Sequence, residues 1–381
     1  MQLANAIVAV SGKRLTAENI YNNQPLGKLA KFIDTYNESK LTTIQQSKSR
    51  NIFQMSPAEK RMFVLYELNH DSTDYNEQTV LNSSTRLDEN RLKRALKALV
   101  LRHEILRTAF YRQNDHYMQK VLSNNQLDFT VIDKEISNYQ ELVKPFDLEA
   151  GETMRIRLIK GEKVDKLFVD KHHIITDGTS ETVFYTELEK LYRGEKLDPV
   201  KFQYKDYSEW FNELDVSDDK QWWNRQLIDY QRLELATDYP WSKNHVAVGT
   251  TVYKKFDADM VAKLRNLAHE TSSSEYMILF SVLSAFLSKT YHSNDFILGT
   301  VASGRVDAAT ENMLGMFINT LPVRVNIKPN LTVLEYLAMM KKTLLASLAH
   351  QNYQFEDIVH DLHATSDVGL SLIHISEPTR P

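Results

Sequence analysis

The stretch His172-His173-Ile174-Ile175-Thr176-Asp177-Gly178 is the most informative part of this 381-residue chain. It contains two adjacent histidines, an acid four residues beyond the second, and a glycine directly after the acid. A neutral imidazole can accept a proton near neutral pH, and an ionised aspartate can hold a neighbouring group in place. The pattern therefore indicates an enzyme in which one imidazole reacts.

Two other interpretations of the histidine pair are possible. Histidines are often satisfied structural residues, and a pair beside an acid can ligate zinc. Adjacent histidines on an extended segment point to opposite faces, however, and the helical His-Glu-x-x-His spacing is missing. The pattern does not favour a metal site.

The loop resembles the active-site signature His-His-x-x-x-Asp-Gly of the condensation domains of nonribosomal peptide synthetases, which form amide bonds between carrier-bound substrates. Further segments resemble motifs of that family in the expected order: residues 56–62, 102–110, 204–210, 315–320 and 350–356. Glu59 stands where glutamine is usual, and Tyr207 where phenylalanine is common. The resemblance covers about residues 53 to 362.

This resemblance implies an α/β (α+β) fold of two chloramphenicol-acetyltransferase-like lobes in a V, with a channel between them. The first lobe is expected at 53–225 and an incomplete second lobe at 226–369, because the family's final Arg-Asp-x-Ser-Arg motif is not found. We therefore expect weak activity, or none, from this chain by itself.

The two ends of the chain differ from the rest. Residues 1–36 look like the second half of a peptidyl carrier domain without the serine that receives phosphopantetheine, and the polar residues 37–52 look like a linker. Residues 370–381 look like translated sequencing adapter, a non-native tail that is excluded from fold reasoning.

Composition fits a cytoplasmic enzyme. A formal net charge of −4 gives no electrostatic reason to expect nucleic acid, and no stretch is long and apolar enough to indicate a membrane span. The chain has no cysteine, so any thioester sulfur must come from the substrate.

Local patterns place the histidine loop between a strand and a helix. Alternation predicts strands at 154–158 and 164–169, and Ser180 is expected to cap a helix that Gly194 ends. Further along we expect strands at 251–256 and 296–301, helices at 259–269 and 274–290, and a buried helical stretch at 276–287.

The chemistry implied by the resemblance is attack of an acceptor amine on a donor thioester. His173 would orient the amine, take its proton or stabilise the intermediate, while His172 is expected to be packed. Asp177 would pair with Arg305 to support the loop. Gly178 would keep space at the turn, Asn319 would donate near the carbonyl or cap a strand, and Arg61 would lie near the site or on a helix surface.

Two alternatives remain: an epimerisation domain with the same fold, which residues 315–320 disfavour, and a noncatalytic platform that docks carrier domains. No metal and no cofactor bound by the domain itself are expected. The implied partners are donor and acceptor peptidyl carrier domains bearing 4′-phosphopantetheine, and an adjacent adenylation domain.

Overall fold

The computed structural model describes residues 2–13, 15, 17–36, 43–48, 50–123, 127–230, 233, 235, 238 and 251–362. The chain divides into two compact units. The first, the histidine-loop unit, comprises Leu41–Asp215 and Arg305–Ile318; the second, the β8–β9 unit, comprises Met1–Lys40, Val216–Gly304 and Asn319–Pro381. The predicted tail 370–381 and residues 37–42 and 49 of the predicted linker lie outside the described residues.

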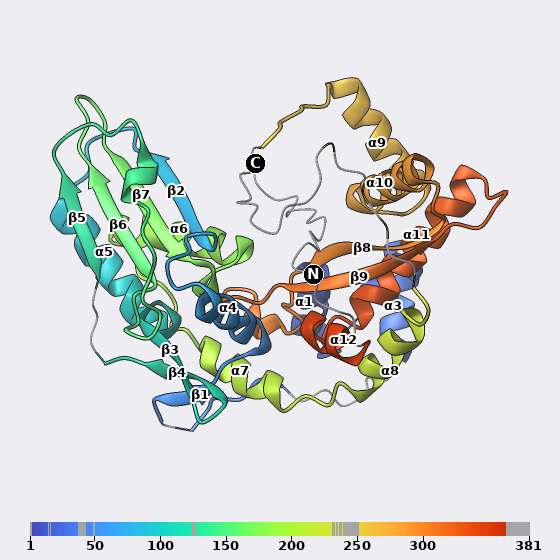
Figure 1. Ribbon diagram of the computed structural model, residues 1–381, viewed down its shortest axis with the longest axis horizontal. Coiled ribbons are helices and arrows are strands. Elements are labelled where there is room, and N and C mark those ends of the chain that lie inside the picture. Colours follow the sequence, from blue (N-terminus) through green and yellow to red (C-terminus); the bar gives the residue numbers. More distant parts are fainter. Residues whose placement is uncertain are drawn as a thin grey trace. The chain divides into compact units, whose positions relative to one another are not determined.

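A four-stranded sheet forms the centre of the histidine-loop unit (Figure 1). Its order is β2 (Asn76–Asn82), β7 (Lys166–His172), β6 (Met154–Ile159) and β5 (Asp128–Ile132). Every pairing is antiparallel except that of β5 with β6. Apolar residues on β6 and β7 are fully buried, which anchors the strand that leads into the histidine loop.

Two long helices cover the same apolar core. Helix α5 (Glu89–Arg102) packs on α6 (Gly178–Arg193), and both contribute buried leucines to the cluster that contains the β6 and β7 side chains. On α5 the buried residues Leu92, Leu96 and Leu99 recur at helical spacing. The remaining elements of the unit are α4 (Pro57–Leu68), η1 (Glu104–Arg107), η2 (Tyr139–Leu142), η3 (His173–Ile175), α7 (Tyr204–Asn212) and η4 (Ala308–Thr310).

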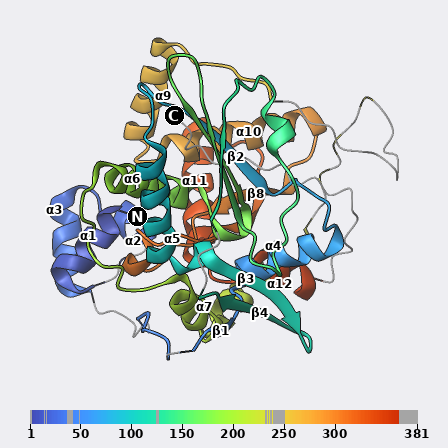
Figure 2. The same cartoon turned by 90° about the vertical axis from the view of Figure 1, so that its left-hand side faces the viewer.

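A second, smaller sheet completes this unit. Strands β3 (Thr108–Gln113) and β4 (His116–Val121) run side by side as an antiparallel pair, and β1 (Ile52–Gln54) joins the other edge of β4 (Figure 2). Its turn at residues 114 and 115 uses the left-handed conformation that hairpin turns require.

The β8–β9 unit is built on one antiparallel pair. Strand β8 (Asp295–Ala302) pairs with β9 (Asn319–Asn326) along their full length, from Asp295↔Asn326 to Ala302↔Asn319. Helix α11 (Val333–Ala349) packs on β9 and on α10 (Glu275–Tyr291). The other helices are α1 (Gln2–Ser11), α2 (Ala17–Asn22), α3 (Leu26–Thr35), α8 (Ser217–Gln226), α9 (Ala258–Glu270) and α12 (Phe355–Asp361).

The mixed α/β class is confirmed, with three local corrections. Residues 251–256 form no strand, because a strand needs a partner and β8 and β9 pair only with each other among the described residues. Asp177 rather than Ser180 caps α6, since its carboxylate accepts from the Ser180 amide at 2.7 Å. Helix α10 is buried on one face only, and Leu279, Val282 and Phe286 on its other face are exposed.

The units also divide the chain differently from the expected lobe boundary at 225/226. Residues 216–225 belong to the β8–β9 unit, and residues 305–318, expected in the second lobe, belong to the histidine-loop unit. The side chains of Met313, Leu314, Met316 and Phe317 explain the second difference, because they join the apolar core of the histidine-loop unit. In the part of the chain that the structure describes, no helix is long and apolar enough to cross a bilayer.

Candidate active site

The histidine loop is held rigidly between a strand and a helix. His172 ends β7, His173 opens the short helix η3, and Asp177 caps α6. Ile174 and Ile175 are both fully buried, and the backbone N–H of His173 donates to the Tyr75 carbonyl at 2.8 Å. The loop therefore fixes the position of its second imidazole before any substrate arrives.

His173 has a defined tautomer. Its Nδ1 lies 2.7 Å from the carbonyl oxygen of Thr176. A carbonyl oxygen can only accept, so Nδ1 carries the proton and the lone pair of the neutral imidazole is on Nε2. The side chain is 24% exposed, and Nε2 lies 3.6 Å from Oε1 of Glu77, too long for a hydrogen bond. Nε2 is thus an accessible proton acceptor.

His172 is packed, as expected. It is buried, its Nδ1 accepts from the Ile174 amide at 3.1 Å, and its ring meets the Phe146 ring edge-on. Burial, assisted by the neighbouring His173, lowers the pKa of His172 to about 3. It stays neutral at neutral pH and shapes the loop.

The predicted ion pair between Asp177 and Arg305 is present. Nη2 of Arg305 donates to Oδ1 of Asp177 at 2.8 Å, and both side chains are buried, which excludes solvated surface charges. The second carboxylate oxygen accepts from the Phe317 amide at 3.3 Å. Since both partners lie in the histidine-loop unit, the pair fastens residues 305–318 to the start of α6.

Arg305 is satisfied on several sides. It donates to the carbonyls of Thr310 and Met313 and to the Ser180 hydroxyl, and its guanidinium lies 4.0 Å from the centre of the Phe317 ring. A buried charge with this many partners is held in one conformation. These contacts hold Arg305 in place against Asp177 and the 305–318 segment.

Arg61 and Gly178 both lie in the histidine-loop unit. Arg61 on α4 donates to the Ile318 carbonyl at 2.6 Å and so also contacts the 305–318 segment. Gly178 begins α6 and is not among the described glycines with positive φ, so the backbone conformation there does not require glycine.

Asn319 has its amide engaged elsewhere, in the β8–β9 unit. Its Nδ2 donates to the carbonyls of Gln351 and Tyr353, and its Oδ1 accepts from the Phe355 amide at 3.2 Å. These bonds use both of its N–H groups. They fit the predicted role of capping a strand better than that of donating near the reacting carbonyl.

The polar residues of the 102–110 motif form a structural network with α6. Arg102 and His103 both contact the carboxylate of Glu187 on α6, at 2.8 and 2.6 Å. Sequence reasoning missed Glu187 as their partner, because nothing in the pattern of α6 distinguishes it from a solvated glutamate.

Glu77, beside Nε2 of His173, was also missed. The segment 76–82, Asn-Glu-Gln-Thr-Val-Leu-Asn, lacks the alternation that predicts a strand, so its pairing with β7 had no sequence signal.

Comparison with known proteins places this geometry in a family. A family model described as "Condensation domain" matches residues 49–376. The chain belongs to this family. The match confirms the resemblance of the motifs and ends within the predicted adapter-derived tail, at residue 376.

Curated relatives of this condensation domain are far longer than the chain. The chain is 32% identical over 364 residues to Tyrocidine synthase 3 of Brevibacillus parabrevis. This alignment covers 93% of the chain and 6% of that protein. The chain is 33% identical over 335 residues to Surfactin synthase subunit 2 of Bacillus subtilis (strain 168), covering 85% of this chain and 9% of that subunit.

Solved structures share its fold. The X-domain from teicoplanin biosynthesis matches with a TM-score of 0.77 at 22% identity, covering 87% of this chain and 78% of that one. The condensation domain of the Monacolin K polyketide synthase MokA matches with a TM-score of 0.72 at 20% identity, covering 87% and 79%. These matches support the predicted fold.

Proposed function

We propose that this condensation domain forms an amide bond between a donor acyl or peptidyl thioester and the amine of a carrier-bound acceptor amino acid. The observation that supports this most directly is the tautomer of His173, because a fixed Nε2 lone pair suits proton transfer from a nitrogen nucleophile.

In the proposed reaction the neutral acceptor amine attacks the thioester carbonyl. As the C–N bond forms, Nε2 of His173 accepts a proton from the amine; when the C–S bond breaks, the leaving thiolate takes that proton. A free α-amine has a pKa of about 8, so about a tenth is already neutral at pH 7. His173 therefore orients the amine and takes up the charge that develops in the intermediate. It does not deprotonate an ammonium before the attack.

Asp177 and Arg305 support this reaction without touching it. Their buried pair holds the N-terminus of α6 and the 305–318 segment, so the loop keeps its conformation while His173 changes charge. Arg61 acts on the same segment from α4 through the Ile318 carbonyl.

The proposed partners are donor and acceptor carrier domains with 4′-phosphopantetheine thioesters and an adjacent adenylation domain. We further propose that residues 1–36, which include helices α1 to α3, are part of a peptidyl carrier domain. A match to Bacitracin synthase 3 of Bacillus licheniformis covers 96% of this chain and so extends into this segment, before the family match begins at residue 49.

The test measures dipeptidyl product from separately loaded donor and acceptor carriers, at an enzyme concentration high enough to detect the weak activity expected of this chain. We expect His173→Ala to lower the rate by about 100- to 10,000-fold, the usual contribution of a positioned acid–base group. The matched control is His116→Ala, which removes an exposed histidine of the same unit and should leave the rate unchanged.

Equal product from His173→Ala and the parent chain would remove His173 from the mechanism. Product that contains an epimerised donor residue but no new amide would favour the epimerisation alternative. Carrier binding without either product would favour the docking platform.

A further inference from the structure

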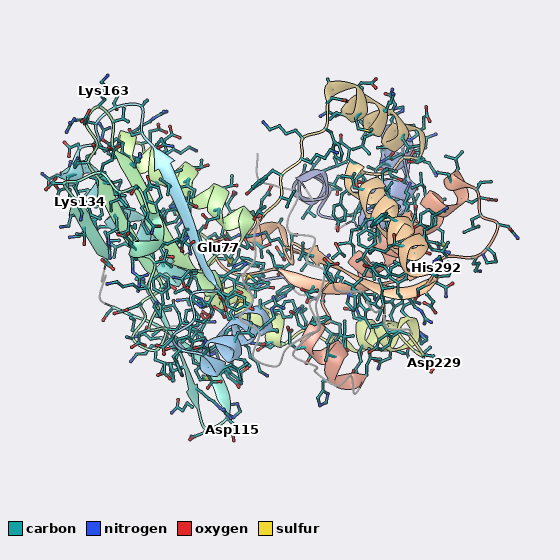
Figure 3. All side chains as sticks on the ribbon, turned by 45° about the horizontal axis from the view of Figure 1, so that its top comes forward. Glu77, Asp115, Lys134, Lys163, Asp229 and His292 are labelled. Atoms are coloured by element: carbon teal, nitrogen blue, oxygen red, sulfur yellow. The ribbon has the colours of Figure 1, made fainter. Side chains whose placement is uncertain are left out.

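Glu77 lies directly beside the proposed catalytic nitrogen. Strand β2 pairs with β7 so that Glu77 is opposite Lys171, two residues before His173. Figure 3 labels Glu77 on this strand. Its Oε1 is 3.6 Å from Nε2 of His173, and the two side chains are about equally exposed, at 22% and 24%.

Polar contacts lead from Nδ1 of His173 to Lys171, which lies across the sheet from Glu77. Nδ1 of His173 donates to the Thr176 carbonyl, and the Thr176 hydroxyl donates to Oε1 of Glu181 at 2.7 Å. The same oxygen is 2.7 Å from Nζ of Lys171, whose opposite residue across the sheet is Glu77. We call these residues the His173 polar network: Glu77, Lys171, His173, Thr176 and Glu181.

The charge of this network depends on the state of His173. Glu77 and Glu181 each carry −1 and Lys171 carries +1, so the sum is −1 with a neutral imidazole and zero with an imidazolium. Lys171 is 1% exposed and lies against the rings of Phe184 and Tyr185, which reduces screening by water. The network is therefore electrostatically complementary to protonated His173.

Other titratable groups also pack around the loop. Asp177 pairs with Arg305, and Asp170 on β7 pairs with Arg155. His172 is neutral at neutral pH, and burial raises the pKa of Glu59 on α4 to about 8. The remaining groups on α4, which packs against η3, are Lys60, Arg61, Tyr66 and Glu67, and Tyr75 precedes β2. The carboxylate that faces Nε2 is that of Glu77.

We propose that Glu77 is a positioning residue of the condensation reaction, which stabilises the imidazolium of His173 while that residue holds the proton taken from the acceptor amine. The role rests on the proposed function of His173. Glu77 forms no bond to substrate and gains no proton; it supplies the opposite charge next to Nε2 at the moment when that nitrogen becomes N–H⁺. The Lys171–Glu181 pair keeps the Thr176 end of the loop in place.

The experiment compares Glu77→Gln with Glu189→Gln across pH, using amide formation from loaded carriers. Glu189 is an exposed glutamate of the same unit, paired with Arg193 on α6, and its replacement should change nothing. Glu77→Gln keeps the size of the side chain but removes its charge. We expect kcat to fall by about 10- to 100-fold, as a nearby charge of this kind contributes.

The pH profile distinguishes this role from a structural one. Removing a carboxylate next to Nε2 makes the imidazole harder to protonate, so the acidic limb of the kcat/KM profile should move about one unit to lower pH. A merely structural Glu77 would lower the rate without moving that limb. Glu77→Asp, which keeps the charge but draws it back from Nε2, should move the limb in the same direction by a smaller amount.

If Glu77→Gln keeps the parental kcat and the parental acidic limb of the kcat/KM profile while His173→Ala is inactive, this inference is overturned and the proposed function stays intact. An active His173→Ala would instead overturn the proposed function itself. Should Glu77→Gln fail to fold, histidine ¹⁵N NMR of Glu77→Asp and of the parent chain decides the matter, because a titration of His173 that is the same with the carboxylate drawn back would also contradict the role.

Discussion

At the scale of single residues, Glu59 shows how burial makes one carboxyl group behave as an amide. It is fully buried at the third position of α4, where its Oε2 accepts from the Ser56 amide at 2.8 Å and from Nε2 of Gln119 at 2.9 Å. Burial raises the pKa of Glu59 from 4.5 to about 8. At neutral pH it is therefore protonated and close in shape and hydrogen bonding to glutamine, the residue that the family resemblance predicts here.

This pKa makes stability depend on pH in a defined direction. The folded chain holds the Glu59 proton more tightly than the unfolded chain, so its contribution is complete below pH 4.5 and is lost as pH rises toward about 8. Above that range the cost is on the order of 5 kcal/mol. We expect Glu59→Gln to raise the Tm at pH 9 and to leave it nearly unchanged at pH 5.

The matched control is Glu67→Gln on the same helix, at a partly exposed position. Thermal melts of the parent chain and both variants between pH 5 and pH 9 check the prediction. A Tm difference between Glu59→Gln and the parent that is the same at both ends of this range would contradict it.

At the scale of residues, positions could be predicted from sequence where they lie within one motif. His172, His173 and Asp177 belong to one short loop, so the backbone between them fixes where they lie relative to one another. Arg305 was placed by the family resemblance rather than by a local pattern. Glu77 had no such guide, because its proximity to His173 arises only when two strands 90 residues apart pair in one register.

At the scale of elements, the close approach of Gly315 and Tyr204 fixes the path of the 305–318 segment. Gly315 has a φ of 151°, and a Cβ there would lie 1.9 Å from Cδ2 of Tyr204. Tyr204 begins α7 and is itself held by Ser56 and the Met316 carbonyl, so its ring has no free direction in which to move. Glycine is needed at this position for two independent reasons.

We expect Gly315→Ala to lower the free energy of unfolding by about 3 kcal/mol or more, because overpacking and backbone strain add. Gly194→Ala is the control, since Gly194 ends α6 with a φ of 83° but has no atom within 4 Å of the added Cβ. That variant should cost only about 1 kcal/mol. Urea unfolding measures both, and equal losses would show that crowding by Tyr204 is unimportant.

Helices were easier to predict than strands, for a physical reason. The helices α6, α9 and α10 carry their periodicity and end signals within a single stretch, and their observed bounds lie within three residues of the expected ones. A strand is stabilised by neighbours that the local sequence does not contain. The segment 251–256 was therefore predicted as a strand where none forms, while β2, which lacks alternation, is paired along its whole length.

At the scale of the whole molecule, the ion pair of Asp177 and Arg305 joins residues 128 positions apart. Replacing Arg305 by Met leaves a buried carboxylate without its cation, which typically costs about 3–5 kcal/mol. We expect Arg305→Met to lower the Tm and to speed hydrogen exchange at the amides of Gly315 and Phe317, which donate to Ser180 and Asp177.

Arg193→Met provides the comparison, because it breaks the exposed pair with Glu189, where a loss of less than about 1 kcal/mol is expected. Hydrogen exchange read by mass spectrometry reports the 305–318 segment directly. Unchanged protection there in Arg305→Met would mean that the apolar contacts of the segment hold it without the ion pair.

The β8–β9 ladder ends where Ala302 faces Asn319. The chain leaves the β8–β9 unit shortly after this rung, at Gly304, and returns to it at Asn319. Residues 305–318 are therefore an insertion between the two paired strands. Their apolar side chains nevertheless belong to the core of the histidine-loop unit. Chimaeras assembled from different synthetases therefore have a third and a fourth junction besides those near residues 40 and 215. A transplant of 41–215 that omits its own 305–318 would pair Asp177 with the recipient's arginine and pack its apolar core against the recipient's counterpart of that segment.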